Sequence, residues 1–192
     1  IGKDRSGSWK MLFPINAKEI IFEKSHICSY MPLIYILQDI HKGVNISVQN
    51  VKTSLYNGYK TLLENEGNKD KIIAILKKQG KRDLMKTVKS NQATLEEVIF
   101  SEDYYLTDLD YWVFSNSNKI PIILFASTTL KQLSNEINWL QLGGTGKANE
   151  AFYFLRTTSG VLNSNEPMEY HLVIPAQPLE NMKNTMFVEG RQ

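Results

Sequence analysis

Residues 107–127, TDLDYWVFSNSNKIPIILFAS, predict a helix that is followed directly by a buried strand. Thr107, with Asp110 in the third position after it, matches a capping box, a pattern that satisfies free backbone amides where a helix begins. Residues 120–126 form a continuous apolar run, which is typical of a strand covered on both faces. We expect three side chains on the inner face of the helix, namely Leu109, Trp112 and Val113.

Helices are expected before this stretch and strands after it. The spacing of apolar residues predicts helical segments at 29–41, 48–67, 72–76, 82–89 and 94–100. Residues 151–156 and 170–174 predict two strands of a hairpin with a long loop, and residues 19–22 predict a short strand. This order predicts an α+β fold, with helices packed on a small mixed or antiparallel sheet of three or four strands.

The length of 192 residues fits one domain, which we place at 19–178 between an irregular segment (1–18) and a tail (179–192). The net charge of +2 gives no reason to expect nucleic acid as a partner, and no apolar run approaches the ~20 residues that span a membrane. A single cysteine without a signal-peptide pattern predicts an intracellular, reducing compartment. Since the chain starts at Ile1 and not at Met, we expect neighbouring domains in a longer polypeptide.

Charge is distributed unevenly along the chain. Residues 69–89 carry an excess of +6, whereas residues 96–110 carry −6 without a basic residue. One interpretation is a pair of solvated faces whose opposite charges cancel in the total. The other is a docking face for a charged partner, with a nucleic-acid contact through residues 69–89 as the weaker alternative.

Two motifs that suggest a cofactor do not meet its requirements. Residues 143–148, GGTGKA, resemble a phosphate loop, but Gln141 replaces its first glycine and Ala148 replaces the residue that holds magnesium. We therefore expect a loop there. One cysteine and three scattered histidines also lack the close spacing of a zinc site, so no metal or cofactor is expected.

Cys28 is placed near the start of the helix predicted at 29–41. Pro32 belongs in a first helical turn, and Ser29 is a residue that can cap the free amides there. A helix N-terminus lowers the pKa of a thiol, and a histidine brought close by the fold can act as its base. His171, in the strand predicted at 170–174, is the best partner. A buried core cysteine and a satisfied strand histidine remain the alternative.

The order of these features resembles the ovarian-tumour (OTU) family of papain-like cysteine proteases, most of which are deubiquitinases. Cys28 heads an apolar helix with the aromatic Tyr30 two residues later, residues 107–127 give an acidic helix before a buried strand, and His171 lies in the last strand. The resemblance extends over residues 22–175. Residues 107–127 are also similar to OTU-like segments in large proteins of big DNA viruses, and the composition, rich in Lys, Asn and Ile, suits an AT-rich genome.

The resemblance implies a thiol hydrolase that cleaves ubiquitin or a ubiquitin-like protein from conjugates, in the host-cell cytoplasm or the virion. Cys28 would attack the carbonyl carbon, and His171 would act as base and then as acid. The chain departs from the family pattern at 25–27, where Ser-His-Ile replaces Asp-Gly-Asn, and at Val173, where the family has an orienting Asn or Asp. Nearby candidates for that third role are Glu169, Asn163 and Asn165. These departures motivate an alternative, an inactive OTU-like binding or scaffold module of a larger viral protein.

Overall fold

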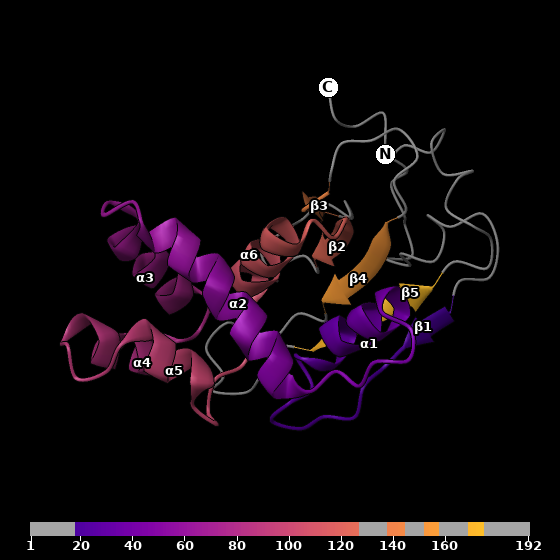
Figure 1. Cartoon of the computed structure of the whole chain (residues 1–192), viewed down its shortest axis with the longest axis horizontal. Helices are drawn as coiled ribbons and strands as arrows, with labels where there is room; N and C mark the ends of the chain where they lie inside the picture. The colour runs from indigo at the N-terminus through magenta and orange to yellow at the C-terminus, as the bar shows by residue number, and fades with distance from the viewer. Residues whose placement is uncertain (1–17, 127–137, 145–151, 158–168, 175–192) are drawn as a thin grey trace, which may run out of the picture.

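The computed structural model describes residues 18–126, 138–144, 152–157 and 169–174. Within them the fold is mixed α/β, with six helices and a five-stranded sheet (Figure 1). The elements in chain order are β1 (Lys18–Ile20), α1 (Met31–Ile40), α2 (Val48–Leu63), α3 (Asn68–Lys78), α4 (Arg82–Lys89), α5 (Leu95–Phe100), α6 (Asp108–Asn118), β2 (Ile122–Ala126), β3 (Asn138–Leu142), β4 (Tyr153–Thr157) and β5 (Tyr170–Ile174).

The strands lie in the order β1-β5-β4-β2-β3. Only β2 and β4 are parallel neighbours, and β4 and β5 form the antiparallel pair that the sequence predicted. The prediction of three or four strands was wrong because Asn138–Leu142, which has no continuous apolar run, adds the edge strand β3. The predicted N-terminal strand pairs with β5 and closes the opposite edge, so the sheet is not built from the C-terminal half alone.

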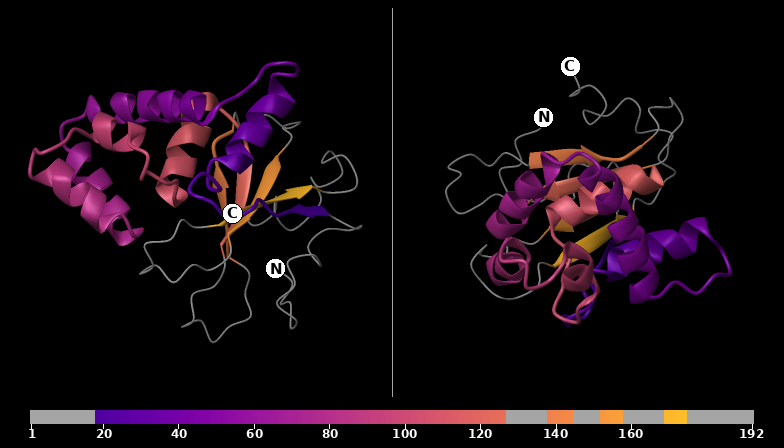
Figure 2. Two further views of the ribbon diagram at one scale, coloured as in Figure 1. Left: turned by 90° about the horizontal axis from the view of Figure 1, so that it is seen from below. Right: turned by 60° about the vertical axis from the view of Figure 1, so that its left-hand side comes forward.

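The helices lie on one side of the sheet (Figure 2, left). Strand residues alternate between the two faces. Ile20, Leu155 and Leu172 are neighbours on the face that joins the helices in one hydrophobic core. Glu19 and Val173 are paired across strands on the far face, where Phe125 and Phe154 also stack with their ring centroids 6.1 Å apart.

Helix α6 connects the helical layer to the sheet. Thr107 and Asp110 form the predicted capping box, and the helix runs directly into β2. The predicted inner face is wrong in one respect, because Trp112 is 41% exposed while Asp110 is fully buried. Asp110 faces inward since a buried lysine and two tyrosines bind its carboxylate, as described below.

Helices α2 and α6 pack closely against each other. At Gly58 of α2, an added Cβ would lie 2.7 Å from Cγ1 of Val113 and 3.0 Å from Oγ of Ser117. Glycine is therefore needed at this position for close approach of the two helices.

Candidate functional site

Cys28 lies in the turn that leads into α1. The helix begins at Met31, whose N–H donates to the Cys28 carbonyl at 3.3 Å, and Pro32 lies in the first turn as predicted. The expected start at Ser29 was wrong. Cys28 is therefore just ahead of the helix rather than at its first free amide.

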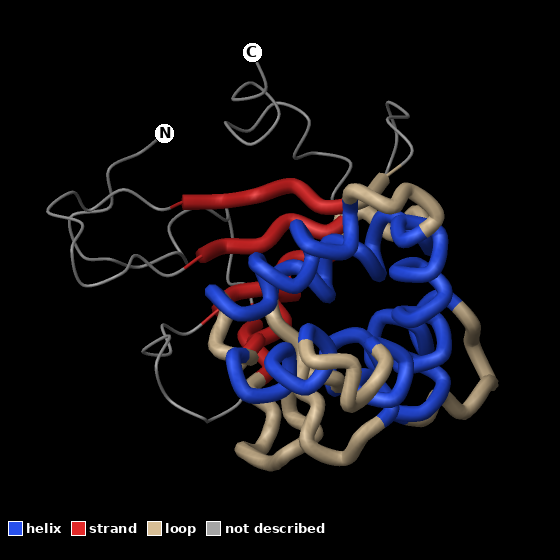
Figure 3. Tube along the Cα trace, turned by 90° about the vertical axis from the view of Figure 1, so that its left-hand side faces the viewer, coloured by secondary structure: helices blue, strands red, loops and turns tan. Residues whose placement is uncertain are grey.

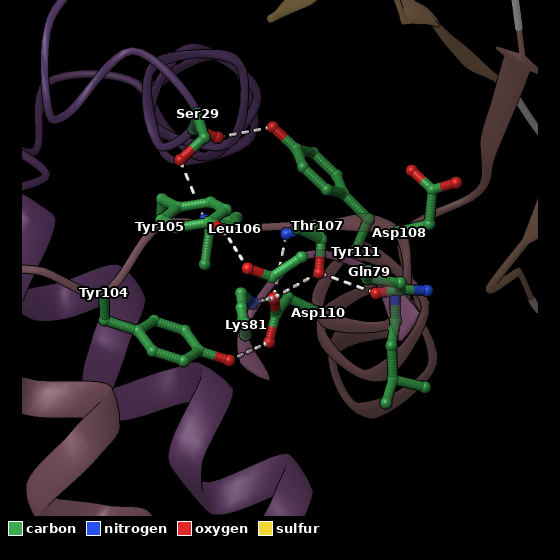
Figure 4. Close-up of polar contacts among 12 residues, drawn as sticks. Ser29, Gln79, Lys81, Tyr104, Tyr105, Leu106, Thr107, Asp108, Asp110 and Tyr111 are labelled. Atoms are coloured by element: carbon green, nitrogen blue, oxygen red, sulfur yellow. Dashed lines mark hydrogen bonds and ion pairs between the residues drawn. The ribbon is translucent and has the colours of Figure 1, made fainter. Parts of the chain in front are cut away.

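Ser29 does not cap α1, because its side chain has a different partner. Its Oγ accepts a hydrogen bond from the Leu106 N–H at 2.9 Å, and its carbonyl accepts one from the Tyr111 hydroxyl (Figure 4). Both bonds attach the turn that contains Cys28 to the segment that enters α6. The turn is thereby placed on the helical side of the sheet.

The thiol of Cys28 is enclosed in this environment. The residue is 2% exposed and unbonded to any other cysteine. Burial, and then the nearby Cys28, raise the pKa of the Tyr111 phenol well above its ordinary value. The thiol is consequently close to a neutral phenol.

His171 lies on the far face of the sheet within a group of charged side chains, which we call the far-face cluster (Glu19, Arg156, Glu169 and His171). Its Nδ1 is 2.7 Å from Oε1 of Glu19, and Nη1 of Arg156 donates to the same oxygen at 2.7 Å. Its Nε2 is 3.5 Å from Oε2 of Glu169 and, although buried, has no hydrogen-bond partner among the described residues. The carboxylate of Glu19, in β1, therefore fixes the orientation of the His171 imidazole.

The cluster also sets the protonation of Glu19. Burial raises the pKa of its carboxyl, while the hydrogen bonds from His171 and Arg156 and their charges lower it. The net effect is a pKa below the ordinary value of 4.5. Glu19 is thus held as a carboxylate.

Strand β5 separates the two predicted catalytic residues. The ring of Tyr170 packs against Tyr111 on the helical side, with centroids 4.1 Å apart. Because successive side chains of a strand point to opposite faces, His171 points away from that side. No hydrogen bond joins Cys28 to His171 in the described part of the chain. Their assignment as nucleophile and base stays a prediction.

Of the predicted orienting residues, Glu169 lies near the imidazole, while Asn163 and Asn165 fall outside the described residues. Glu19 was missed. It is 152 residues from His171 in sequence, and only the pairing of β1 with β5 brings the two together. Residues 145–148 of the glycine-rich loop also fall outside the described residues.

A second buried polar group surrounds Asp110 and joins α6 to α2 and to the α3–α4 turn (Figure 4). Its Oδ1 accepts hydrogen bonds from the hydroxyls of Tyr59 at 2.7 Å and Tyr104 at 2.5 Å. Its Oδ2 accepts from the Thr107 N–H at 2.8 Å and forms an ion pair with Lys81. Lys81 also lies 4.1 Å from the centroid of the Tyr104 ring.

Burial shifts the protonation equilibria of this group. It lowers the pKa of Lys81, partly offset by Asp110, and together with Asp110 it raises the pKa of Tyr59 and Tyr104 well above the ordinary range. Each polar atom that binds Asp110 is buried with it. Because every member of this group is buried, we assign it a stabilising role.

Other site types find no support in the described ranges. There, no group of three or more His, Cys, Asp or Glu side chains is arranged to hold a metal ion. None of the described helices is long and apolar enough to cross a membrane. Comparison with protein-family models, curated proteins and solved structures gives no match.

Proposed function

We propose that this chain is a non-catalytic binding module with an OTU-like arrangement of elements. The observation that carries the proposal is the position of His171 on the far face of β5, while Cys28 lies on the helical side. In a Cys–His hydrolase the base must come within hydrogen-bond reach of the thiol, about 2.6–3.2 Å or somewhat more without substrate.

A small loop movement would not bring the two side chains together. A one-residue shift in the pairing of β5 would move His171 to the helical side, but it would flip every side chain of the strand. Tyr170 would then lose the Tyr111 ring, and Leu172 would leave the hydrophobic core. These losses oppose the shift.

The burial of Cys28 supports the same proposal. A nucleophile that attacks a protein substrate must be accessible to the carbonyl carbon, and Cys28 is 2% exposed. The residues at 25–27 add no glycine that would let backbone amides approach a substrate oxygen.

A Cys28-dependent deubiquitinase-like hydrolase is the second candidate. Cys28 does precede an apolar helix, and the Glu19 carboxylate binds His171 Nδ1 as an orienting residue of a catalytic histidine would. A family resemblance implies ubiquitin or a ubiquitin-like protein as the partner in both cases.

The test is a ubiquitin probe with a C-terminal electrophile, applied to the folded wild type and to Cys28→Ala, with binding of free ubiquitin measured by calorimetry. The proposal predicts no covalent labelling of either protein, and binding of a partner without cleavage. Labelling of the wild type that is lost in Cys28→Ala would establish the hydrolase instead.

A further inference from the structure

Helices α3 and α4 carry most of the positive charge of residues 69–89. They lie at the end of the molecule farthest from β5 (Figure 1), and Figure 3 looks onto this end. Lys81, however, is buried with Asp110 and does not contribute to the surface. Of the remaining exposed cations, we call Lys71, Lys78, Arg82, Lys86 and Lys89 the basic ridge; Lys69, at the start of α3, is exposed as well.

The ridge follows from helical spacing. With 3.6 residues per turn, Arg82, Lys86 and Lys89 fall within an arc of about 60° on α4, to one side of its buried stripe. Lys71 and Lys78 are seven residues apart on α3, about two turns, and face away from the buried residues of that helix. The two helices pack against each other, so both rows lie at the same end of the molecule.

The cations of the ridge are not ion-paired within the described structure. Lys81 is paired with Asp110, Arg156 with Glu19, and no ion pair of the described residues includes a member of the ridge. Asp70 and Asp83 are the acidic residues of the two helices, against six exposed cations, which are Lys69 and the five members of the ridge. The ridge would therefore attract a partner with dense negative charge more strongly than a neutral partner.

Nucleic acid fits the shape of this charge. Lys71 to Lys78 and Arg82 to Lys89 each extend about 10 Å along a helix axis, at 1.5 Å per residue. A duplex presents one phosphate charge per about 1.7 Å of axis, so each row faces several phosphates at once. Four of the five side chains are lysines, which bind phosphates as point charges, and contacts to phosphates carry no sequence information.

We propose that the basic ridge binds the phosphate backbone of nucleic acid without sequence preference. The ridge is remote in sequence from Cys28 and His171, so this inference does not depend on the proposed function. It assigns a partner to the positive segment, which the balanced net charge of the whole chain conceals.

The test is fluorescence anisotropy of a labelled 20-bp DNA duplex titrated with the protein over a range of salt concentrations. We expect binding that weakens steeply with salt, and the triple variant Arg82→Gln/Lys86→Gln/Lys89→Gln should lower the log–log salt slope by about 2.7, or 0.9 per lost phosphate contact. The matched control, Lys18→Gln/Lys42→Gln/Lys119→Asn, removes equal charge from exposed sites on other elements. Asparagine tolerates the positive φ of 54° at residue 119.

Three results would overturn the proposal. The first is absence of binding at low salt by wild-type protein that circular dichroism shows to be folded. The second is equal weakening in both triple variants, which would indicate a response to net charge. The third is tighter binding of labelled polyglutamate than of DNA, which would assign the ridge to an acidic protein partner.

Discussion

Removal of the buried Asp110 carboxylate should strongly destabilise the fold. Asp110→Ala leaves the ammonium of Lys81 without a counter-ion in a fully buried place. Breaking a buried ion pair by removing one partner costs about 3–5 kcal/mol. The hydroxyls of Tyr59 and Tyr104 also lose their acceptor, and each unsatisfied donor adds up to about 1–3 kcal/mol. These contributions are not additive, so we expect a loss of at least about 3 kcal/mol.

That loss is large relative to the whole stability of a domain, about 5–15 kcal/mol. Urea unfolding at pH 7, followed by circular dichroism and by tryptophan fluorescence, measures it. Asp110→Asn keeps an acceptor oxygen for the tyrosines and should cost less than Asp110→Ala. Lys81→Met alone should also destabilise, because it leaves the carboxylate buried without its cation.

The double variant Lys81→Met/Asp110→Asn provides the decisive comparison. Because it removes both buried charges together, it should be more stable than the sum of the single losses predicts, by a coupling energy of about 1–3 kcal/mol. The reasoning is refuted if both single variants lose less than about 1 kcal/mol and their effects simply add.

Three further predictions concern other contacts. Gly58→Ala should destabilise the protein by about 1–3 kcal/mol in urea unfolding, since the new Cβ meets Val113 Cγ1 at 2.7 Å. Val113→Ala in the same chain should restore part of that loss. An unchanged urea midpoint in Gly58→Ala would contradict the close packing. Ser29→Ala should cost about 1–3 kcal/mol because the buried Leu106 N–H loses its acceptor, and no measurable change would argue against that bond. The pKa of Glu19 in the folded protein is below 4.5, so between that pKa and about pH 4.5 the unfolded chain binds more protons than the folded one. The free energy of unfolding that Glu19 contributes above about pH 4.5 is therefore lost as the pH falls through the folded pKa. In Glu19→Gln, the urea midpoint should fall less steeply between about pH 6 and pH 3 than in the wild type, and an unaltered pH dependence would refute the assignment.

The sequence predicted the elements best where local signals agree. The capping box at Thr107, the apolar spacing at 82–89 and the short apolar run at 170–174 are all present as predicted. Each of these signals depends on residues only a few positions apart, so it can be read directly from the sequence. Asn138–Leu142 lacked such a signal and was missed, because an edge strand needs only a partner for its backbone.

The candidate site was predicted less completely, because its geometry depends on pairs far apart in sequence. The side chains of Glu169–Ile174 alternate between the two faces of the sheet, but the sequence does not say which set faces the helices. The contact of Tyr170 with Tyr111 shows that Tyr170 belongs to that set. In the same way, Asp110 faces inward in place of Trp112 because Lys81 arrives from the α3–α4 turn. The oppositely charged segments thus meet inside the fold at this one pair.

The separation of Cys28 from His171 is tested most directly by the rate at which iodoacetamide alkylates Cys28 as a function of pH, in the wild type and in His171→Gln. A Cys–His ion pair keeps the thiol reactive well below its ordinary pKa, and loss of the histidine abolishes that reactivity. The account predicts slow alkylation of the buried thiol at about pH 5.5, with a rate in His171→Gln that is unchanged or higher. Fast alkylation at that pH in the wild type, lost in His171→Gln, would contradict it.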